Sequence, residues 1–316
     1  MPALILRRCG SLLLTLAAVS ALIFLVMNVL PGDPAAIMLG TSASPETLDA
    51  LRRELGLDQP VVLRYLQWLL GVASGDLGKS YTYGVPVAGL IADRLVVTLP
   101  LAVMAVLLSI VIAIPLGVIS ASRRNGAFDY TAGVFSQLFI ALPGFWVALI
   151  LILVFSISLD WFPAGGFPGW DRGILNGLRA LLLPAIALAL PQAGVLTRVT
   201  RSSVLEVINE DFVRTARAKG VSRRVALWRH AVRNALVPIV TILGLQFTFL
   251  IAGAILIENV FNLPGLGRLA YQALNQRDII VMQDVVLFFA GLVIIMNFLV
   301  DMTYLLLDPR MRGRGQ

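Results

Sequence analysis

The segment "DFVRTARAKGVSRRVALWRHAVRNALVP", residues 211–238, holds the densest positive charge of this chain and leads directly into a long apolar run. Upstream of Gly220, an apolar residue recurs at every fourth position, which predicts one helix from about residue 201 to residue 218. These apolar positions are Val204, Ile208, Phe212 and Ala216.

Gly220 stands where a helix ends with a residue at positive φ. Ser222 is suited to cap a second helix, with Val225, Trp228 and Val232 on one side. The segment is therefore predicted to form a helix, a tight glycine turn and a second helix.

The composition places the whole chain in a membrane. Of its 316 residues 58% are hydrophobic and only 14% are charged, with a net charge of +7. Soluble domains carry about 25% charged residues. One cysteine, Cys9, excludes an internal disulfide, and a single histidine, His230, argues against a histidine-based metal site within the chain. The apolar runs contain no histidine and no paired carboxylates, so neither a metal site nor catalytic residues are expected.

Six apolar runs are long enough to cross a bilayer, which takes about 20 residues. They cover roughly residues 11–30, 97–119, 131–157, 180–197, 235–257 and 285–307. The first run exceeds the apolar core of a signal peptide, so we expect it to be retained as an anchor. An even number of spans puts both ends of the chain on one side of the membrane.

Arginine and lysine indicate which side that is. They gather before the first span and after the second, fourth and sixth, so these segments are predicted to be cytoplasmic. The sequence thus predicts a multi-pass protein of a bacterial-type cytoplasmic (inner or plasma) membrane, with both termini inside.

The segment after the first span, about residues 31–96, is predicted to be a small extracytoplasmic helical subdomain. "SPETLDALRRELG" places Ser44 as an N-cap, Pro45 in the first turn and Gly56 at the end, and "VVLRYLQWLL" supplies a second amphipathic helix. The stretch "GVASGDLGKS" resembles a phosphate-binding loop, but Ala73 replaces its first glycine and no strand precedes it. No nucleotide or other cofactor is therefore expected in this chain.

Another outer segment, "NLPGLGRLAYQALNQRD", suggests a short amphipathic helix after Pro264. Its apolar positions are Leu266, Leu269, Ala270 and Leu274.

The basic segment has three candidate partners: DNA, anionic lipid headgroups and a cytoplasmic protein. DNA, bound by a helix-turn-helix, is disfavoured because the second helix runs into the fifth span, which leaves no tether to reach a groove. Anionic lipid headgroups account for the charge but not for the apolar stripe and the turn. A docking element for a cytoplasmic protein accounts for the charge, the stripe and the turn, and we expect no nucleic-acid partner.

The basic segment resembles the cytoplasmic loop of ABC-importer permeases of the dipeptide/oligopeptide/nickel subfamily. "LPGDP", "DLGKS", "LPGLGR" and "LLLDPRMR" are similar to that subfamily in the same order, so the resemblance spans nearly the whole chain. In the general permease signature, Glu-Ala-Ala-x-x-x-Gly, Gly220 and Ala216 match. Arg214 and Thr215 depart from it, as they do in the peptide subfamily.

The resemblance implies an all-α polytopic fold with six transmembrane helices and a MetI-like permease core. It divides the chain into residues 1–94 (first helix and extracytoplasmic subdomain), 95–308 (five-helix core with a coupling loop at about 198–234) and 309–316 (a basic tail). It also implies a second, homologous permease chain, two cytoplasmic ATPase subunits or domains that bind ATP and magnesium, and an extracytoplasmic binding protein. The permease itself would not be an enzyme.

The resemblance further implies that the coupling loop, centred on residues 206–230, seats in the ATPase. Phe212 and Ala216 would supply apolar contact, Arg214 and Lys219 polar contact, and Gly220 the turn. The expected coupling residues are Asp211, Phe212, Arg214, Thr215, Ala216, Lys219 and Gly220.

Few charged residues lie within the spans. Asp301 is an intramembrane carboxylate and thus a functional candidate, although pairing near the interface would also explain it. Other polar residues that would line a path or join helices are Asn28, Gln137, Gln192, Gln246 and Asn297.

The resemblance favours di- or oligopeptides as substrate, with nickel chelates, glutathione or another small solute as alternatives. An ion-coupled secondary transporter is a more distant alternative, because the chain shows no internal repeat.

Overall fold

The computed structural model describes residues 2–29, 33–39 and 44–307. This part of the chain is built from helices and turns and contains no strand, only an isolated bridge between Lys79 and Pro86. The predicted all-α fold is confirmed. The predicted tail, residues 309–316, residues 30–32 of "LPGDP" and residues 308–312 of "LLLDPRMR" lie outside the described residues.

The chain forms two compact units. The first comprises residues 1–98 and 264–295, and the second comprises residues 99–263 and 296–316. These units rest on contacts between residues, whereas the division at residue 94 concerns topology in a membrane and stays a prediction.

Five continuous helices among the described residues are long and apolar enough to span a bilayer. They are α1 (Pro2–Val29), α5 (Val87–Ser122), α8 (Ile174–Val207), α11 (Val232–Val260, preceded without a break by residues 223–231) and α13 (Ile279–Leu307). The 36 residues of α5 measure about 54 Å, well beyond a hydrocarbon core of about 30 Å.

Because these helices continue past their apolar runs, the predicted boundaries were too narrow. The second span was expected from residue 97, but α5 begins at Val87 and includes the charged Asp93 and Arg94. Charged residues end an apolar run in the sequence, yet they do not interrupt the backbone hydrogen bonds of a helix.

The third apolar run is not one straight span. It divides into α6 (Ala127–Ala141) and a second helix made of α7 (Gly144–Leu151) and η1 (Ile152–Ser158), which meet at 101°. Pro143 causes the break, because the residue before a proline is driven out of the helical region, and Leu142 has a ψ of 126°. The predicted third span over 131–157 is therefore a bent pair of helices, and the candidate spans among the described residues number five, or six if the bent pair counts as one.

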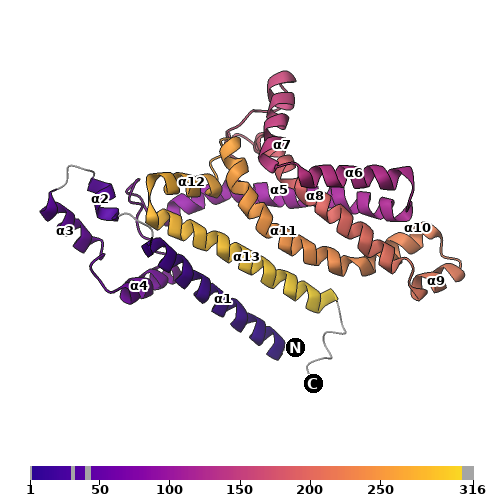
Figure 1. Cartoon of the computed structure of the whole chain (residues 1–316), viewed down its shortest axis with the longest axis horizontal. Helices are drawn as coiled ribbons and strands as arrows, with labels where there is room; N and C mark the ends of the chain where they lie inside the picture. The colour runs from indigo at the N-terminus through magenta and orange to yellow at the C-terminus, as the bar shows by residue number, and fades with distance from the viewer. Residues whose placement is uncertain (1, 30–32, 40–43, 308–316) are drawn as a thin grey trace. The chain divides into compact units, whose positions relative to one another are not determined.

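In the first unit, α2 (Pro34–Leu39) and α3 (Pro45–Glu54) precede α4 (Val61–Ser74) (Figure 1). The predicted N-cap is confirmed, since Ser44 Oγ accepts the Thr47 N–H at 3.3 Å, and Gly56 follows α3 with a φ of +65°. Helix α4 packs against α1 through Phe24, whose ring centroid lies 5.4 Å from that of Tyr65 and 5.8 Å from that of Trp68.

The start of α13 is held in the first unit by buried carboxylates. Asp278 accepts hydrogen bonds from Ser80 Oγ and from the Thr82 N–H at 3.0 Å, and Asp284 Oδ1 accepts the indole N–H of Trp68 at 2.8 Å. The predicted amphipathic helix after Pro264 is confirmed as α12 (Leu266–Gln276).

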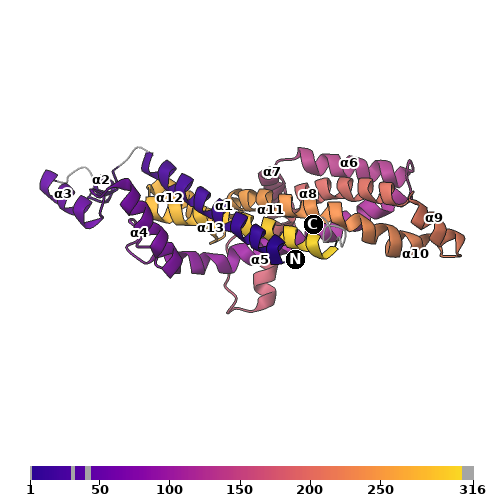
Figure 2. The same cartoon turned by 90° about the horizontal axis from the view of Figure 1, so that it is seen from below.

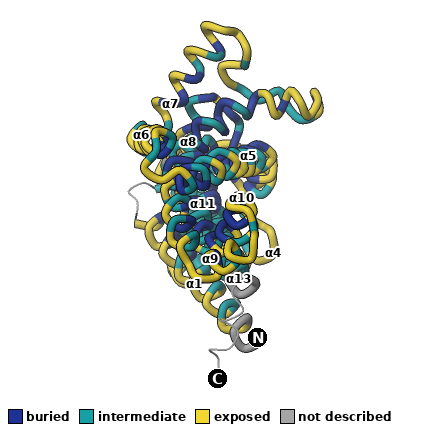
Figure 3. Tube along the Cα trace, turned by 90° about the vertical axis from the view of Figure 1, so that its right-hand side faces the viewer, coloured by how far each residue is buried: buried dark blue, intermediate teal, exposed yellow. Residues whose placement is uncertain are grey.

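In the second unit, α8 packs against α6, α7 and α11 (Figures 1 and 3). Its buried face is rich in small side chains, which let neighbouring helices approach closely. The buried small residues of α8 are Gly177, Ala180, Ala185, Ala187, Ala189, Ala193, Gly194, Thr197, Thr200 and Ser203.

Gly117 marks the tightest approach of α5 to α8. A Cβ at this glycine would lie 2.6 Å from the Cβ of Thr200 and 2.8 Å from the carbonyl oxygen of Thr197. We expect Gly117→Val to destabilise the folded chain by about 2–3 kcal/mol, because overpacking against a backbone atom cannot be relieved by a rotamer change.

Thermal unfolding of the chain in lipid nanodiscs, followed by tryptophan fluorescence, measures this effect. Gly133→Val is the matched control, since a Cβ there meets nothing within 4 Å. Equal unfolding midpoints for the two variants would contradict the packing described.

Candidate functional site

The helix expected over residues 201–218 is two helices. α8 ends at Val207 and α9 (Asp211–Ala218) begins after a turn, closed by a hydrogen bond from the Glu210 N–H to the Val207 carbonyl at 3.1 Å. Glu210 is extended, with ψ at 149°, and Asn209 Nδ2 donates to the Leu205 carbonyl at 2.9 Å. Asparagine side chains compete in this way for backbone groups and so favour a break.

This break changes which residues face inward. Val204 and Ile208 pack in a core with Val118 and Leu227, as the apolar stripe predicted. The stripe does not continue, because Phe212 is 44% exposed and its neighbour Val213 is 1% exposed.

Val213 is the buried residue of α9, and α9 packs against η2 (Ala226–Ala231) of the same chain. Ala216 is half-buried and follows Val213 by three residues, on the same side of the helix. The outward surface consists of Phe212 and polar side chains. The exposed polar residues of α9 and its C-cap are Asp211, Arg214, Thr215, Arg217 and Lys219.

Gly220 makes the turn that the sequence predicted. Its φ is +90°, and the Lys219, Gly220 and Val221 N–H groups donate to the carbonyls of Thr215, Arg217 and Ala216 at 3.0–3.2 Å. Nothing lies within 4 Å of a Cβ built on Gly220. The requirement for glycine therefore comes from the backbone conformation and not from a lack of space.

The second helix is also confirmed in its cap. Ser222 Oγ accepts the Val225 N–H at 3.4 Å at the start of α10 (Arg223–Val225). Its predicted face is wrong in part, because Val225 and Trp228 are exposed while Val232 is buried. The intervening η2 is a π-helix, and its wider turn changes the register that an α-helical period assumes.

Helices α9 and α10 lie together at one end of the second unit, beyond the C-terminal end of α8 (Figures 1 and 2). Arg223 ties this end to α5 by a hydrogen bond from Nη2 to the Ser122 carbonyl at 3.0 Å. Helix α9 is short and is held by one buried valine, Val213, while the aromatic ring of Phe212 is exposed among charged side chains. Such a surface is suited to dock into a cleft of another protein.

A partly buried ion pair close to this end was not predicted. Arg201 of α8 forms two parallel hydrogen bonds to Asp129 of α6, from Nε to Oδ1 at 2.6 Å and from Nη2 to Oδ2 at 2.8 Å. Ser120 Oγ also donates to Asp129, and so does the Asn125 N–H at 2.9 Å.

A sequence signal for this ion pair existed. Asp129 is an acidic residue at the edge of an apolar run, next to the basic segment after the second span, and a carboxylate in that position needs a partner.

The predicted polar residues of the spans do not form one cluster. Gln246 is buried and its Nε2 donates to the Gln192 carbonyl at 2.9 Å, which joins α11 to α8. Gln137 is exposed on α6 and accepts a long hydrogen bond, 3.5 Å, from Arg198 Nη1. Asn297 is exposed and Asp301 is half-buried on α13.

Asn28 lies in the first unit, where its Nδ2 donates to the Phe24 carbonyl at 2.7 Å. Within the described ranges, histidine, cysteine, aspartate and glutamate form no group of three or more that is suited to hold a metal ion.

The family described as "Binding-protein-dependent transport system inner membrane component" matches residues 113–313 of this chain. A related family, which describes the N-terminal part of such membrane components, matches residues 1–102. The chain belongs to this family. The permease is therefore a multi-pass component of an inner membrane, and family membership favours the importer over the ion-coupled transporter.

Full-length relatives agree with this assignment. The permease is 45% identical over 312 residues to a protein of Brucella abortus (strain 2308) that is named as a peptide transport system permease, with 99% of each chain covered. It is 39% identical over 313 residues to the oligopeptide transport system permease protein AppB of Bacillus subtilis (strain 168), with 98% of this chain and 99% of AppB covered.

Solved structures support the predicted MetI-like fold. A structure of the MetNI methionine ABC transporter in inward-facing conformations matches with a TM-score of 0.59 at 18% identity. The match covers 69% of this chain and 96% of the other.

Proposed function

We propose that this permease forms the translocation path of an ATP-driven importer for di- and oligopeptides. The relatives that match over almost their full length are named for peptide transport, and this naming supports the substrate class. Nickel chelates, glutathione and other small solutes remain the alternatives for the same machinery.

The coupling mechanism is supported by the different surroundings of two neighbouring residues on α9. Val213 fastens the helix to the permease, while Phe212 and the neighbouring charged residues are exposed. An ATPase that grips the exposed side moves α9, and α9 moves η2, on which it packs and which continues into α11. The closing of two ATPase subunits on ATP and magnesium is thereby passed to the spans.

The assembly that follows has four kinds of partner. Two cytoplasmic ATPase subunits or domains bind ATP, a second and different permease chain completes the path, an extracytoplasmic protein delivers the peptide, and the bilayer surrounds the spans. Both termini and α9 lie on the cytoplasmic side, as the distribution of arginine supports.

Uptake by the reconstituted complex tests this proposal. The complete importer in proteoliposomes, with its binding protein, is expected to accumulate radiolabelled trialanine only when ATP is present and irrespective of a proton gradient. Accumulation driven by the gradient alone, or of nickel chelates but not peptides, would refute the proposed function or its substrate class.

A substitution at Gly220 tests the coupling turn. Gly220→Val is expected to lower ATP-driven uptake about tenfold or more, because a β-branched residue at a φ of +90° is strained by about 1–3 kcal/mol and shifts the turn. Gly220→Asn is the control, since asparagine tolerates positive φ better. Full uptake by the valine variant would show that the turn is not part of the coupling.

A further inference from the structure

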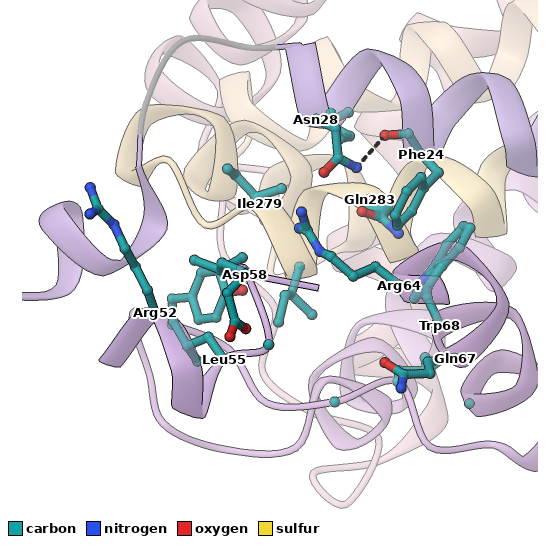
Figure 4. Close-up of a pocket in the computed structure, with 18 of the residues that line it drawn as sticks. Phe24, Asn28, Arg52, Leu55, Asp58, Arg64, Gln67, Trp68, Ile279 and Gln283 are labelled. Carbon is teal, nitrogen blue, oxygen red and sulfur yellow. Dashed lines mark hydrogen bonds between the residues drawn. The ribbon is translucent and has the colours of Figure 1, made fainter. Parts of the chain in front are cut away.

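The first unit contains a cavity of about 600 Å³ that the proposed mechanism does not use (Figure 4). It lies among α1, the end of α3 and the turn that follows, α4, the turn at residues 76–81 and the start of α13. Its size lies within the range of small-molecule sites, about 300–1,000 Å³.

Unpaired charged groups of both signs line the cavity. Arg64 of α4, Asp58 in the turn before α4 and Asp76 in the turn after it form no ion pair with any residue of the described chain. The other arginine of the cavity, Arg52, is already paired with Asp33 at 2.7 Å. Arg64 is thus the cation available to a ligand.

An independent observation points to the same place. Gln283 of α13 lines the cavity, is only 7% exposed, and its side-chain amide has no hydrogen-bond partner among the described residues. The amide atoms are not enclosed by protein but open to the cavity, where a ligand or water can satisfy their hydrogen bonds. Figure 4 shows Arg64 extending across the cavity towards Gln283 and Asn28.

The walls complete a site for a short peptide. Phe24, Trp68 and Tyr81 supply aromatic surface. The Nδ2 of Asn28 donates to the Phe24 carbonyl at 2.7 Å, which leaves its side-chain oxygen to accept an N–H. Amide groups, aromatic faces and unpaired charges of both signs match a zwitterion that carries peptide bonds.

We propose that this cavity binds the free ends of a short peptide, with the α-carboxylate on the guanidinium of Arg64 and the α-ammonium near Asp58. Arginine holds a carboxylate through two parallel hydrogen bonds, and Gln283 donates to the same carboxylate or to the last peptide carbonyl. The inference rests on the proposed import of peptides and adds a peptide site in the first unit of the permease itself.

Equilibrium binding to the assembled importer in lipid nanodiscs, without the binding protein, tests the site. Radiolabelled trialanine is the probe, and unlabelled trialanine and trialanine amide compete with it. We expect the amide to bind about tenfold more weakly, or worse, because it lacks the charge that Arg64 holds, a difference of about 1.4 kcal/mol.

Two variants locate the site. Arg64→Gln is expected to weaken trialanine binding about tenfold and to abolish the difference between acid and amide. Arg53→Gln is the matched control, because Arg53 is an exposed arginine of α3 that does not line the cavity. If Arg64→Gln fails to assemble, the comparison of acid and amide on the unchanged complex still decides.

The proposal is overturned if trialanine shows no saturable binding up to millimolar concentration, or if acid and amide bind equally. It is also overturned if Arg64→Gln leaves trialanine binding unchanged and instead weakens docking of the binding protein. Uptake of trialanine separates the two proposals. Uptake without Arg64-dependent binding refutes the cavity site alone, whereas Arg64-dependent binding without uptake refutes peptide import.

Discussion

Replacing Asp129 with alanine is expected to lower the stability of the permease by about 3 kcal/mol. The carboxylate is buried and accepts four hydrogen bonds, two of them from Arg201. Removing one partner of a buried ion pair costs about 3–5 kcal/mol, because the other charge is left without compensation. We take the lower end because the Arg201 side chain is 35% exposed.

Two further variants separate loss of the pair from loss of packing. Asp129→Leu combined with Arg201→Met should be more stable than Asp129→Ala alone, since apolar residues of similar volume often replace a buried pair without cost. Arg198→Ala is the control on α8, because Arg198 is exposed and, among the described residues, makes a single long hydrogen bond. Its stability should change by less than about 0.5 kcal/mol.

The thermal unfolding midpoint in nanodiscs measures these differences. ATP-driven uptake should fall in parallel, because Arg201 lies six residues before the end of α8, from which α9 follows. Similar midpoints for the Asp129 and Arg198 variants would show that the ion pair contributes no stability.

The second large effect is expected at Phe212, in the affinity between the permease and its ATPase. Phe212→Ala should weaken this association at least about tenfold, because aromatic anchors seated in a cleft of the partner dominate protein interfaces, at about 2 kcal/mol or more each. The side chain is exposed in the isolated chain, so its removal should leave the fold intact.

Val213→Ala is the matched variant one residue further along the same helix. Val213 is buried, so its truncation should lower the stability of the permease by about 1–3 kcal/mol. The two variants should therefore affect different measurements. Phe212→Ala changes association without changing unfolding, and Val213→Ala changes unfolding first.

Association is measured by titrating the purified ATPase onto the permease pair in nanodiscs, with and without ATP. Unchanged affinity for Phe212→Ala would place the contact elsewhere on the loop. A fall in the unfolding midpoint of that variant would show that Phe212 packs within its own protein.

Local chemistry made several features readable from the sequence. The caps at Ser44 and Ser222 and the turn at Gly220 depend on the conformations that these residues prefer within a few neighbours. Apolar composition over long windows likewise predicted an all-α membrane protein, because every backbone polar group in a bilayer must be satisfied within the chain.

Which residues of the candidate site are exposed could not be predicted from the helical period alone. A helical period carried from α8 into α9 placed Phe212 on the same face as Val204 and Ile208, but the turn at Asn209 and Glu210 restarted the helix, exposed Phe212 and put Val213 inward. In the same way, the π-helical turns of η2 exposed Val225 and Trp228 while they buried Leu227 and Ala231. A small change of phase at a break alters which side chains face the partner.

By itself, then, the sequence determined the class of fold, the spans in outline, the caps and the glycine turn, all of which follow from short-range preferences and from solvation. Only the tertiary structure decided that Asp129 pairs with Arg201, 72 positions away, that Trp68 holds Asp284, and that Arg64 and Gln283 meet in one cavity. Such pairings are selected by which helix faces come together. Packing sets those faces through close contacts between whole helices, and no local pattern of residues encodes them.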